Sequence, residues 1–88
     1  MAYDLIWNEG VLKDLKSLDH KTARSLIDSV KNRLAGNPLG LGKPLKGIFK
    51  GLYRYRHGDY RVIYALDRAD KKVIILYIRH RSEAYRER

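Results

Sequence analysis

The sequence predicts an α+β fold, in which a mostly antiparallel four-stranded sheet carries an N-terminal helical hairpin packed on one face. Apolar residues recur at helical spacing over residues 8–35, and three strand-like segments follow between residues 52 and 78 with no helix between them. A short alternating segment precedes the helices. The predicted order is therefore β-α-α-β-β-β, within one domain that spans residues 1–88.

The N-terminal half supplies the first strand and both helices. Residues 2–7 alternate between apolar and polar side chains, which is typical of a short strand. Asn8 and Asp19 are favoured helix N-caps, and an apolar stripe follows each of them. The first stripe ends near Leu18 and the second extends over 20–35, so we expect an antiparallel pair of helices joined by a tight turn.

The C-terminal half supplies the other three strands. They are expected at 52–56, 60–66 and 72–78, after a loop at 37–47 that is rich in glycine and proline. The last strand is apolar on both faces, which indicates a central place in the sheet. Residues 82–88 are polar and form either a short terminal helix or a frayed tail.

A two-residue turn at 58–59 predicts how the second and third strands pair. Gly58 can adopt the positive φ that a type II′ turn requires. Arg56 then lies opposite Arg61, and Arg54 shares their face. A three-residue turn would instead place Arg61 on the core face, where its burial would be costly. The face expected to meet the helices carries Tyr53, Tyr55, Val62 and Tyr64.

Basic residues concentrate in the C-terminal half. The net charge is +9, from 19 Lys and Arg against 10 Asp and Glu. Residues 1–40 hold 6 basic and 5 acidic side chains, whereas residues 41–88 hold 13 and 5, a balance of +8. This asymmetry indicates a polyanionic partner, which could be nucleic acid, an anionic membrane or an acidic protein. The phosphate-binding candidates are Arg54, Arg56, Arg81, Lys43, Lys46 and Lys50.

The sequence gives no support for a metal, a cofactor or a membrane partner. It has no cysteine, and its three histidines are scattered without clustered carboxylates. The glycines of 36–42 lack the strand-loop-helix context of a phosphate loop. No apolar run approaches the roughly 20 residues of a membrane span. The N-terminal residues do not resemble a signal peptide. We therefore expect no metal and no cofactor, and the lack of cysteine fits a cytoplasmic protein.

Two motifs resemble the RelE branch of the RelE/ParE toxin superfamily. They are Gly-Asp-Tyr-Arg-Val-Ile-Tyr at 58–64 and Arg-His-Arg-Ser-Glu-Ala-Tyr at 79–85, and Lys-Pro-Leu-Lys-Gly at 43–47 is similar too. The resemblance covers essentially the whole chain. It implies a RelE-like fold, similar to microbial ribonucleases, and a toxin of a type II toxin–antitoxin system. Such a toxin cuts mRNA in the ribosomal A site without a metal, inhibits translation, and is silenced by a RelB-like antitoxin.

On this resemblance, Arg61, Arg79 and Tyr85 are the catalytic candidates. Arginines can stabilise the negative charge that builds on phosphoryl oxygens, and nearby cations would favour the phenolate of Tyr85, the candidate base. The two arginines before the turn stand where the RelE prototype has lysines, and arginine cannot serve as a general base. His80 stands where the prototype has an acidic residue and is a further acid–base candidate.

Two other functions remain open at this point. One is the ParE-like branch, whose members poison DNA gyrase and generally lack the arginine–tyrosine set. The other is a non-catalytic basic module that binds RNA or the ribosome through phosphate contacts. Mutation separates these functions from an endoribonuclease, because Arg61→Ala and Tyr85→Phe should abolish cleavage without abolishing ribosome binding.

Overall fold

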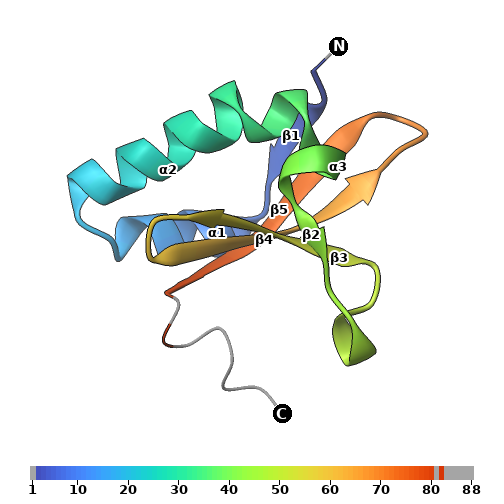
Figure 1. The fold of residues 1–88 in the computed structure, drawn as a ribbon. Helices are drawn as coiled ribbons and strands as arrows, with labels where there is room; N and C mark the ends of the chain where they lie inside the picture. Colours follow the sequence, from blue (N-terminus) through green and yellow to red (C-terminus); the bar gives the residue numbers. More distant parts are fainter. Residues whose placement is uncertain (1, 81, 83–88) are drawn as a thin grey trace.

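The computed structural model describes residues 2–80 and 82. In chain order its helices and strands are β1 (Asp4–Trp7), α1 (Glu9–Lys16), α2 (His20–Asn32), α3 (Pro38–Leu41), β2 (Lys43–Pro44), β3 (Leu52–His57), β4 (Tyr60–Asp67) and β5 (Lys72–His80). The strands form one sheet in the order β1-β5-β4-β3-β2. Only β1 and β5 are parallel among the pairs of the described strands. The predicted α+β class with a mostly antiparallel sheet is therefore confirmed (Figure 1).

Both predicted helix N-caps are confirmed. The Asn8 side chain accepts a hydrogen bond from the backbone N–H of Glu9 at 2.8 Å. Asp19 accepts one from the N–H of Thr22 at 2.9 Å, and its hydrogen bonds with Thr22 lower the pKa of the Asp19 carboxyl. α2 ends three residues before the predicted limit, because the chain tightens into a 3₁₀ turn over Leu34–Gly36.

The sheet has one more strand than the four predicted. β2 lies inside the segment expected to be a loop, which also contains α3, and it pairs with the start of β3 through Lys43 and Pro44. β5 lies between β1 and β4, so its predicted central place is confirmed. It also extends two residues beyond the predicted limit, to His80.

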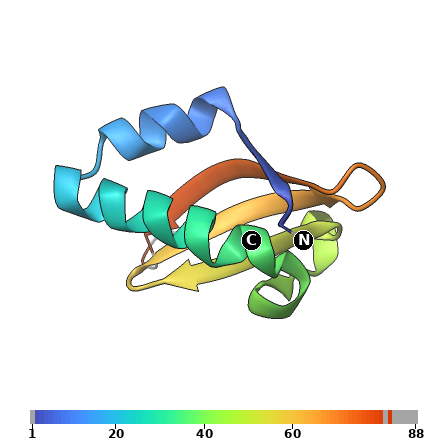
Figure 2. The same ribbon diagram turned by 90° about the horizontal axis from the view of Figure 1, so that it is seen from above.

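The core lies between the helices and one face of the sheet. α2 lies across that face, and α1 lies alongside β5 (Figures 1 and 2). The helices contribute Val11, Leu15, Leu26 and Val30, and the sheet contributes Tyr55, Val62, Tyr64, Val73, Ile75 and Ile78. The face predicted to meet the helices is thus the core face, with Tyr53 packed at its margin. None of the helices in the described part of the chain is long and apolar enough to cross a membrane.

Candidate functional site

A row of three arginines crosses the sheet on the face away from α2. Arg56 pairs with Arg61 between β3 and β4, and Arg61 pairs with Arg79 between β4 and β5. Residues that pair directly project from the same face. The two-residue turn is confirmed, because Gly58 has a φ of 59° and the strands pair in the predicted register.

A second basic row lies beside the first. Lys43 pairs with Arg54 between β2 and β3, which places both on the face that carries the three arginines. We call this surface the basic face; it comprises Lys43, Arg54, Arg56, Arg61 and Arg79. Lys46 and Lys50 flank a 3₁₀ turn in the β2–β3 connection, and both are exposed. The structure therefore brings three of the predicted phosphate-binding side chains, Lys43, Arg54 and Arg56, to one face of the sheet.

Arg61 is far less exposed to solvent than a residue that binds a ligand at the protein surface would be. Only 8% of it is accessible to solvent, whereas Arg56 is exposed and Arg54 is half-buried. Arg61 lies on β4, with long side chains in register on both neighbouring strands, and this central position reduces its exposure. A guanidinium removed from water interacts more strongly with a phosphate, although it offers little surface to a ligand.

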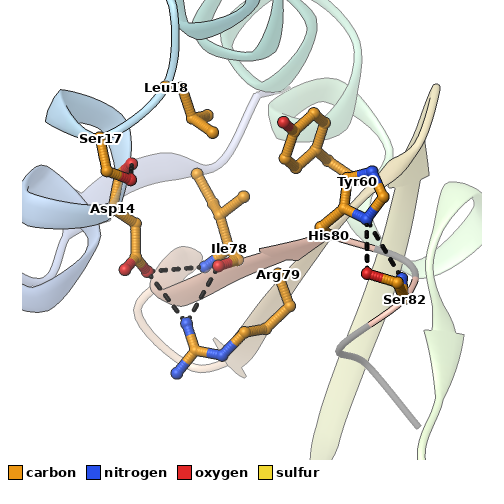
Figure 3. A pocket seen from close by; sticks show the side chains of 8 residues that line it. All are labelled: Asp14, Ser17, Leu18, Tyr60, Ile78, Arg79, His80 and Ser82. Carbon is orange, nitrogen blue, oxygen red and sulfur yellow. Dashed lines mark hydrogen bonds and ion pairs between the residues drawn. The ribbon is translucent and has the colours of Figure 1, made fainter.

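Arg79 is held in place by three neighbours, and Figure 3 draws two of them, Asp14 and Ile78. Its Nη1 atom donates to Oδ2 of Asp14 on α1 at 3.3 Å and to the backbone carbonyl of Ile78 at 3.0 Å. Its guanidinium carbon lies 4.4 Å from the centre of the Tyr77 ring, within the range of a cation–π contact. The predicted catalytic arginine therefore forms an ion pair with a carboxylate.

A hollow of about 580 Å³, which Arg79 helps to line, lies between the end of α1, the start of β4 and the end of β5. Tyr60 and His80 line it with their rings in an edge-to-face arrangement, 5.2 Å apart. Nδ1 of His80 accepts from the N–H of Ser82 at 3.2 Å. Because β5 continues through His80, His80 and Arg79 project from opposite faces, and the structure does not place this histidine on the basic face.

Two predicted site residues, Arg81 and Tyr85, lie outside the described residues. Within the described range, no group of three or more His, Cys, Asp or Glu side chains could hold a metal ion. The sequence-based prediction missed Asp14 and Tyr77. Tyr77 could have been found, because it lies two residues before Arg79 on the same strand face. No pattern in the sequence pointed to Asp14, since 65 residues separate it from Arg79 and only the packing of α1 brings the two side chains together.

The chain matches one protein family over nearly its whole length. The family is described as ParE toxin of the type II toxin–antitoxin system, parDE, and residues 5–85 match its model. Toxin RelE of Mycobacterium tuberculosis is 43% identical over 74 residues, which are 84% of this chain and 76% of that protein. Toxin RelG of the same organism is 30% identical over 86 residues, covering 98% of this chain and 99% of that protein.

Solved structures share the fold. The toxin–antitoxin complex RelBE2 from Mycobacterium tuberculosis contains a chain that superimposes with a TM-score of 0.88 at 28% identity. That match covers 92% of this chain and 100% of the other. The archaeal RelE–RelB complex from Pyrococcus horikoshii contains a chain with a TM-score of 0.73 at 31% identity, covering 96% of this chain and 100% of the other.

Proposed function

The chain belongs to the RelE/ParE superfamily as a RelE-type toxin of a type II toxin–antitoxin system, and we propose that it is a ribosome-dependent endoribonuclease. It cuts mRNA in the ribosomal A site without a metal ion and thereby stops translation. A toxin that acts on translating ribosomes works in the cytoplasm.

The row formed by Arg56, Arg61 and Arg79 is the observation that carries this proposal. Three adjacent strands present these guanidinium groups in register on one face of a rigid sheet. Guanidinium groups bind phosphate through paired hydrogen bonds. Like charges directly opposite each other destabilise a sheet, so a row of cations fits a surface whose anionic ligand offsets that repulsion.

The reaction that fits this surface is cleavage by the neighbouring 2′-hydroxyl. The 2′-oxygen attacks phosphorus and loses its proton to a base, for which Tyr85 is our candidate. The bond from phosphorus to the 5′-oxygen breaks, the 5′-oxygen gains a proton, and a 2′,3′-cyclic phosphate remains. Negative charge builds on the phosphoryl oxygens in the transition state, and Arg79 and Arg61 stabilise it. Lys43, Arg54 and Arg56 hold flanking phosphates.

The partners follow from the same proposal. The similar chains in the RelBE2 and RelE–RelB structures are in toxin–antitoxin complexes, and we expect a cognate RelB-like antitoxin for this chain. Ribosome-bound mRNA is the substrate. An acidic antitoxin segment would be captured quickly by the basic face, because complementary charge accelerates association.

Two observations favour other functions. The matching family model describes ParE toxins, which keeps a ParE-like inhibitor of DNA gyrase as a second candidate. The low exposure of Arg61 favours a non-catalytic module that binds RNA or the ribosome through the more exposed side chains of the basic face.

Primer extension on mRNA in a translating extract tests the proposal. We expect cuts inside codons, and these cuts should appear only when ribosomes are present. Arg61→Ala and Arg79→Ala should each lower the cleavage rate by about 100- to 1000-fold, and Tyr85→Phe should abolish cleavage while ribosome binding stays measurable. Arg24→Ala, which changes an exposed arginine on α2, is the matched control and should cleave like the wild type.

Each alternative predicts a different result. Normal cleavage by Arg61→Ala and Tyr85→Phe would refute the catalytic assignment. Wild-type protein that binds ribosomes without cutting mRNA would indicate a binding module. Inhibition of purified gyrase, with no effect on mRNA, would indicate the ParE-like function.

A further inference from the structure

Asp14 links α1 to the end of β5 through a single carboxylate oxygen. Its Oδ2 atom accepts from the backbone N–H of Ile78 at 3.0 Å and from Nη1 of Arg79 at 3.3 Å. β1 pairs with β5 only as far as Ile75, so beyond that point α1 replaces β1 along the β5 edge. Asp14 supplies there the acceptor that a neighbouring strand would otherwise provide.

The contacts of Arg79 engage one corner of its guanidinium group. Nη1 makes both hydrogen bonds, to Asp14 and to the carbonyl of Ile78, and the group lies against the Tyr77 ring. Among the side chains drawn in Figure 3, dashed lines join Arg79 only to Asp14 and Ile78. Within residues 2–80 and 82, the Nε and Nη2 atoms have no hydrogen-bond partner. Those two atoms form the edge with which arginine binds a phosphate or carboxylate through two parallel hydrogen bonds.

We propose that Asp14 is a positioning residue that anchors Arg79 by Nη1 and presents its Nε–Nη2 edge to an RNA phosphate. This inference rests on the proposed endoribonuclease function and adds to it a carboxylate that touches no substrate. An anchored arginine loses less side-chain freedom when the phosphate binds, and a rigid donor stabilises developing charge better than a mobile one. Small errors in the position of such a group reduce the rate strongly.

Simple electrostatics predicts the opposite effect of neutralising Asp14. If the carboxylate merely competed with RNA for Arg79, its removal would strengthen RNA binding and accelerate cleavage. If it positions Arg79, its removal lowers the maximum rate even though the protein becomes more cationic. The sign of the change therefore separates the two roles.

The test is a double-mutant cycle with Asp14→Asn, Arg79→Ala and the combined variant. Asparagine retains an oxygen that can accept from the N–H of Ile78, so the β5 edge keeps its acceptor, but it lacks the negative charge of the ion pair that holds Arg79. The readout is single-turnover cleavage of mRNA on programmed ribosomes, giving a maximum rate and a half-saturating toxin concentration. Asp28→Asn, at an exposed position on α2, makes the same charge change and is the matched control.

We expect Asp14→Asn to lower the maximum rate by about 10- to 100-fold, with a half-saturating concentration that is unchanged or lower. In the Arg79→Ala background the same substitution should have almost no further effect, and Asp28→Asn should behave like the wild type. A maximum rate that is unchanged or raised in Asp14→Asn overturns the proposal. An equal loss in both backgrounds also overturns it, because Asp14 would then act on the fold and not through Arg79.

A measurement without ribosomes keeps this inference separate from the proposed function. The ¹⁵N heteronuclear NOE of the Arg79 Nε–H group reports how rigidly the side chain is held. We expect a high value in the wild type and a clear loss in Asp14→Asn, and equal values would overturn the positioning role. If the wild type does not cut mRNA at all, the proposed function fails, while the NOE still decides whether Asp14 anchors Arg79.

Discussion

Arg61 lies directly opposite Arg79 where β4 pairs with β5, and directly opposite Arg56 where β4 pairs with β3. Arg61 is 8% exposed, so it carries its charge in a poorly hydrated position between two other cations. Such an arrangement opposes folding, because like charges directly opposite each other destabilise a sheet and burial removes hydration from the central one. These two effects predict that Arg61 lowers the stability of the fold, which fits the proposal that an anionic ligand offsets the repulsion.

Replacing Arg61 with an apolar side chain of similar length should therefore stabilise the protein while inactivating it. We expect Arg61→Met to raise the free energy of unfolding by about 1–3 kcal/mol, measured by urea denaturation. Arg24→Met, at an exposed position on α2, should change it by less than about 0.5 kcal/mol. A less stable Arg61→Met variant would show that the interactions of Arg61 outweigh the repulsion.

Lys43 should contribute affinity without contributing to the chemical step. It is exposed on β2 and shares a face with Arg54, so it can reach a flanking phosphate. We expect Lys43→Ala to weaken ribosome binding, and the slope of log affinity against log salt should become shallower by about one unit. Lys31→Ala, on the exposed side of α2, should leave the slope unchanged. Equal slopes for both variants would remove Lys43 from the RNA-binding surface.

Local turn chemistry made the basic face predictable. Gly58 can adopt a positive φ, and a two-residue turn then determines which side chains of β3 and β4 lie opposite each other. The register that places Arg54, Arg56 and Arg61 together therefore follows from residues that are adjacent in the sequence. The two helix caps were predictable for the same reason.

Tertiary packing determines the features that sequence reasoning missed. β2 has only two residues, one of them Pro44, so it shows no alternation and is recognisable only from its pairing with β3. The burial of Arg61 depends on neighbours contributed by two other strands. The contact between Asp14 and Arg79 depends on where α1 lies against β5, which no short-range pattern encodes.

Ser29 and Tyr55 make a buried hydrogen bond that ties α2 to the sheet. Their hydroxyl groups are hydrogen-bonded, and the two residues are 7% and 5% exposed. Ser29→Ala or Tyr55→Phe alone should each lower the free energy of unfolding by about 1–3 kcal/mol, because the remaining hydroxyl loses its partner. The double variant should lose less than the sum of the two in urea denaturation. Strictly additive losses would mean that the two hydroxyls are independent.

Gly42 should not tolerate a side chain. A Cβ atom at this position would lie 1.6 Å from the hydroxyl oxygen of Tyr64, which is fully buried and donates to the carbonyl of Pro38 at 2.6 Å. Gly42→Ala should therefore lower the free energy of unfolding by about 1–3 kcal/mol. Gly10→Ala is the matched control, because nothing lies within 4 Å of its Cβ position and alanine favours the helix. If both variants have the same free energy of unfolding, the contact between the added Cβ atom and Tyr64 does not destabilise the protein.

Tyr64 should make the protein sensitive to alkaline pH. Its burial, with Tyr53 and Tyr55 nearby, raises the pKa of its phenol well above the usual value of about 10. The folded state therefore keeps the proton at a pH where the unfolded chain releases it. The resulting stability is fully present below about pH 10 and declines above it, by up to about 1.4 kcal/mol per pH unit.

Urea denaturation of the wild type and Tyr64→Phe at pH 8, 10 and 11 tests this linkage. At pH 8 we expect the variant to be less stable by about 1 kcal/mol, because it loses the hydrogen bond to the carbonyl of Pro38. Above pH 10 the wild type should lose stability faster than Tyr64→Phe, since only the wild type must keep a buried phenol protonated at this position. Lysines titrate in both proteins, so their effect cancels in the comparison. Parallel curves from pH 8 to pH 11 would show that Tyr64 ionises equally in the folded and unfolded states.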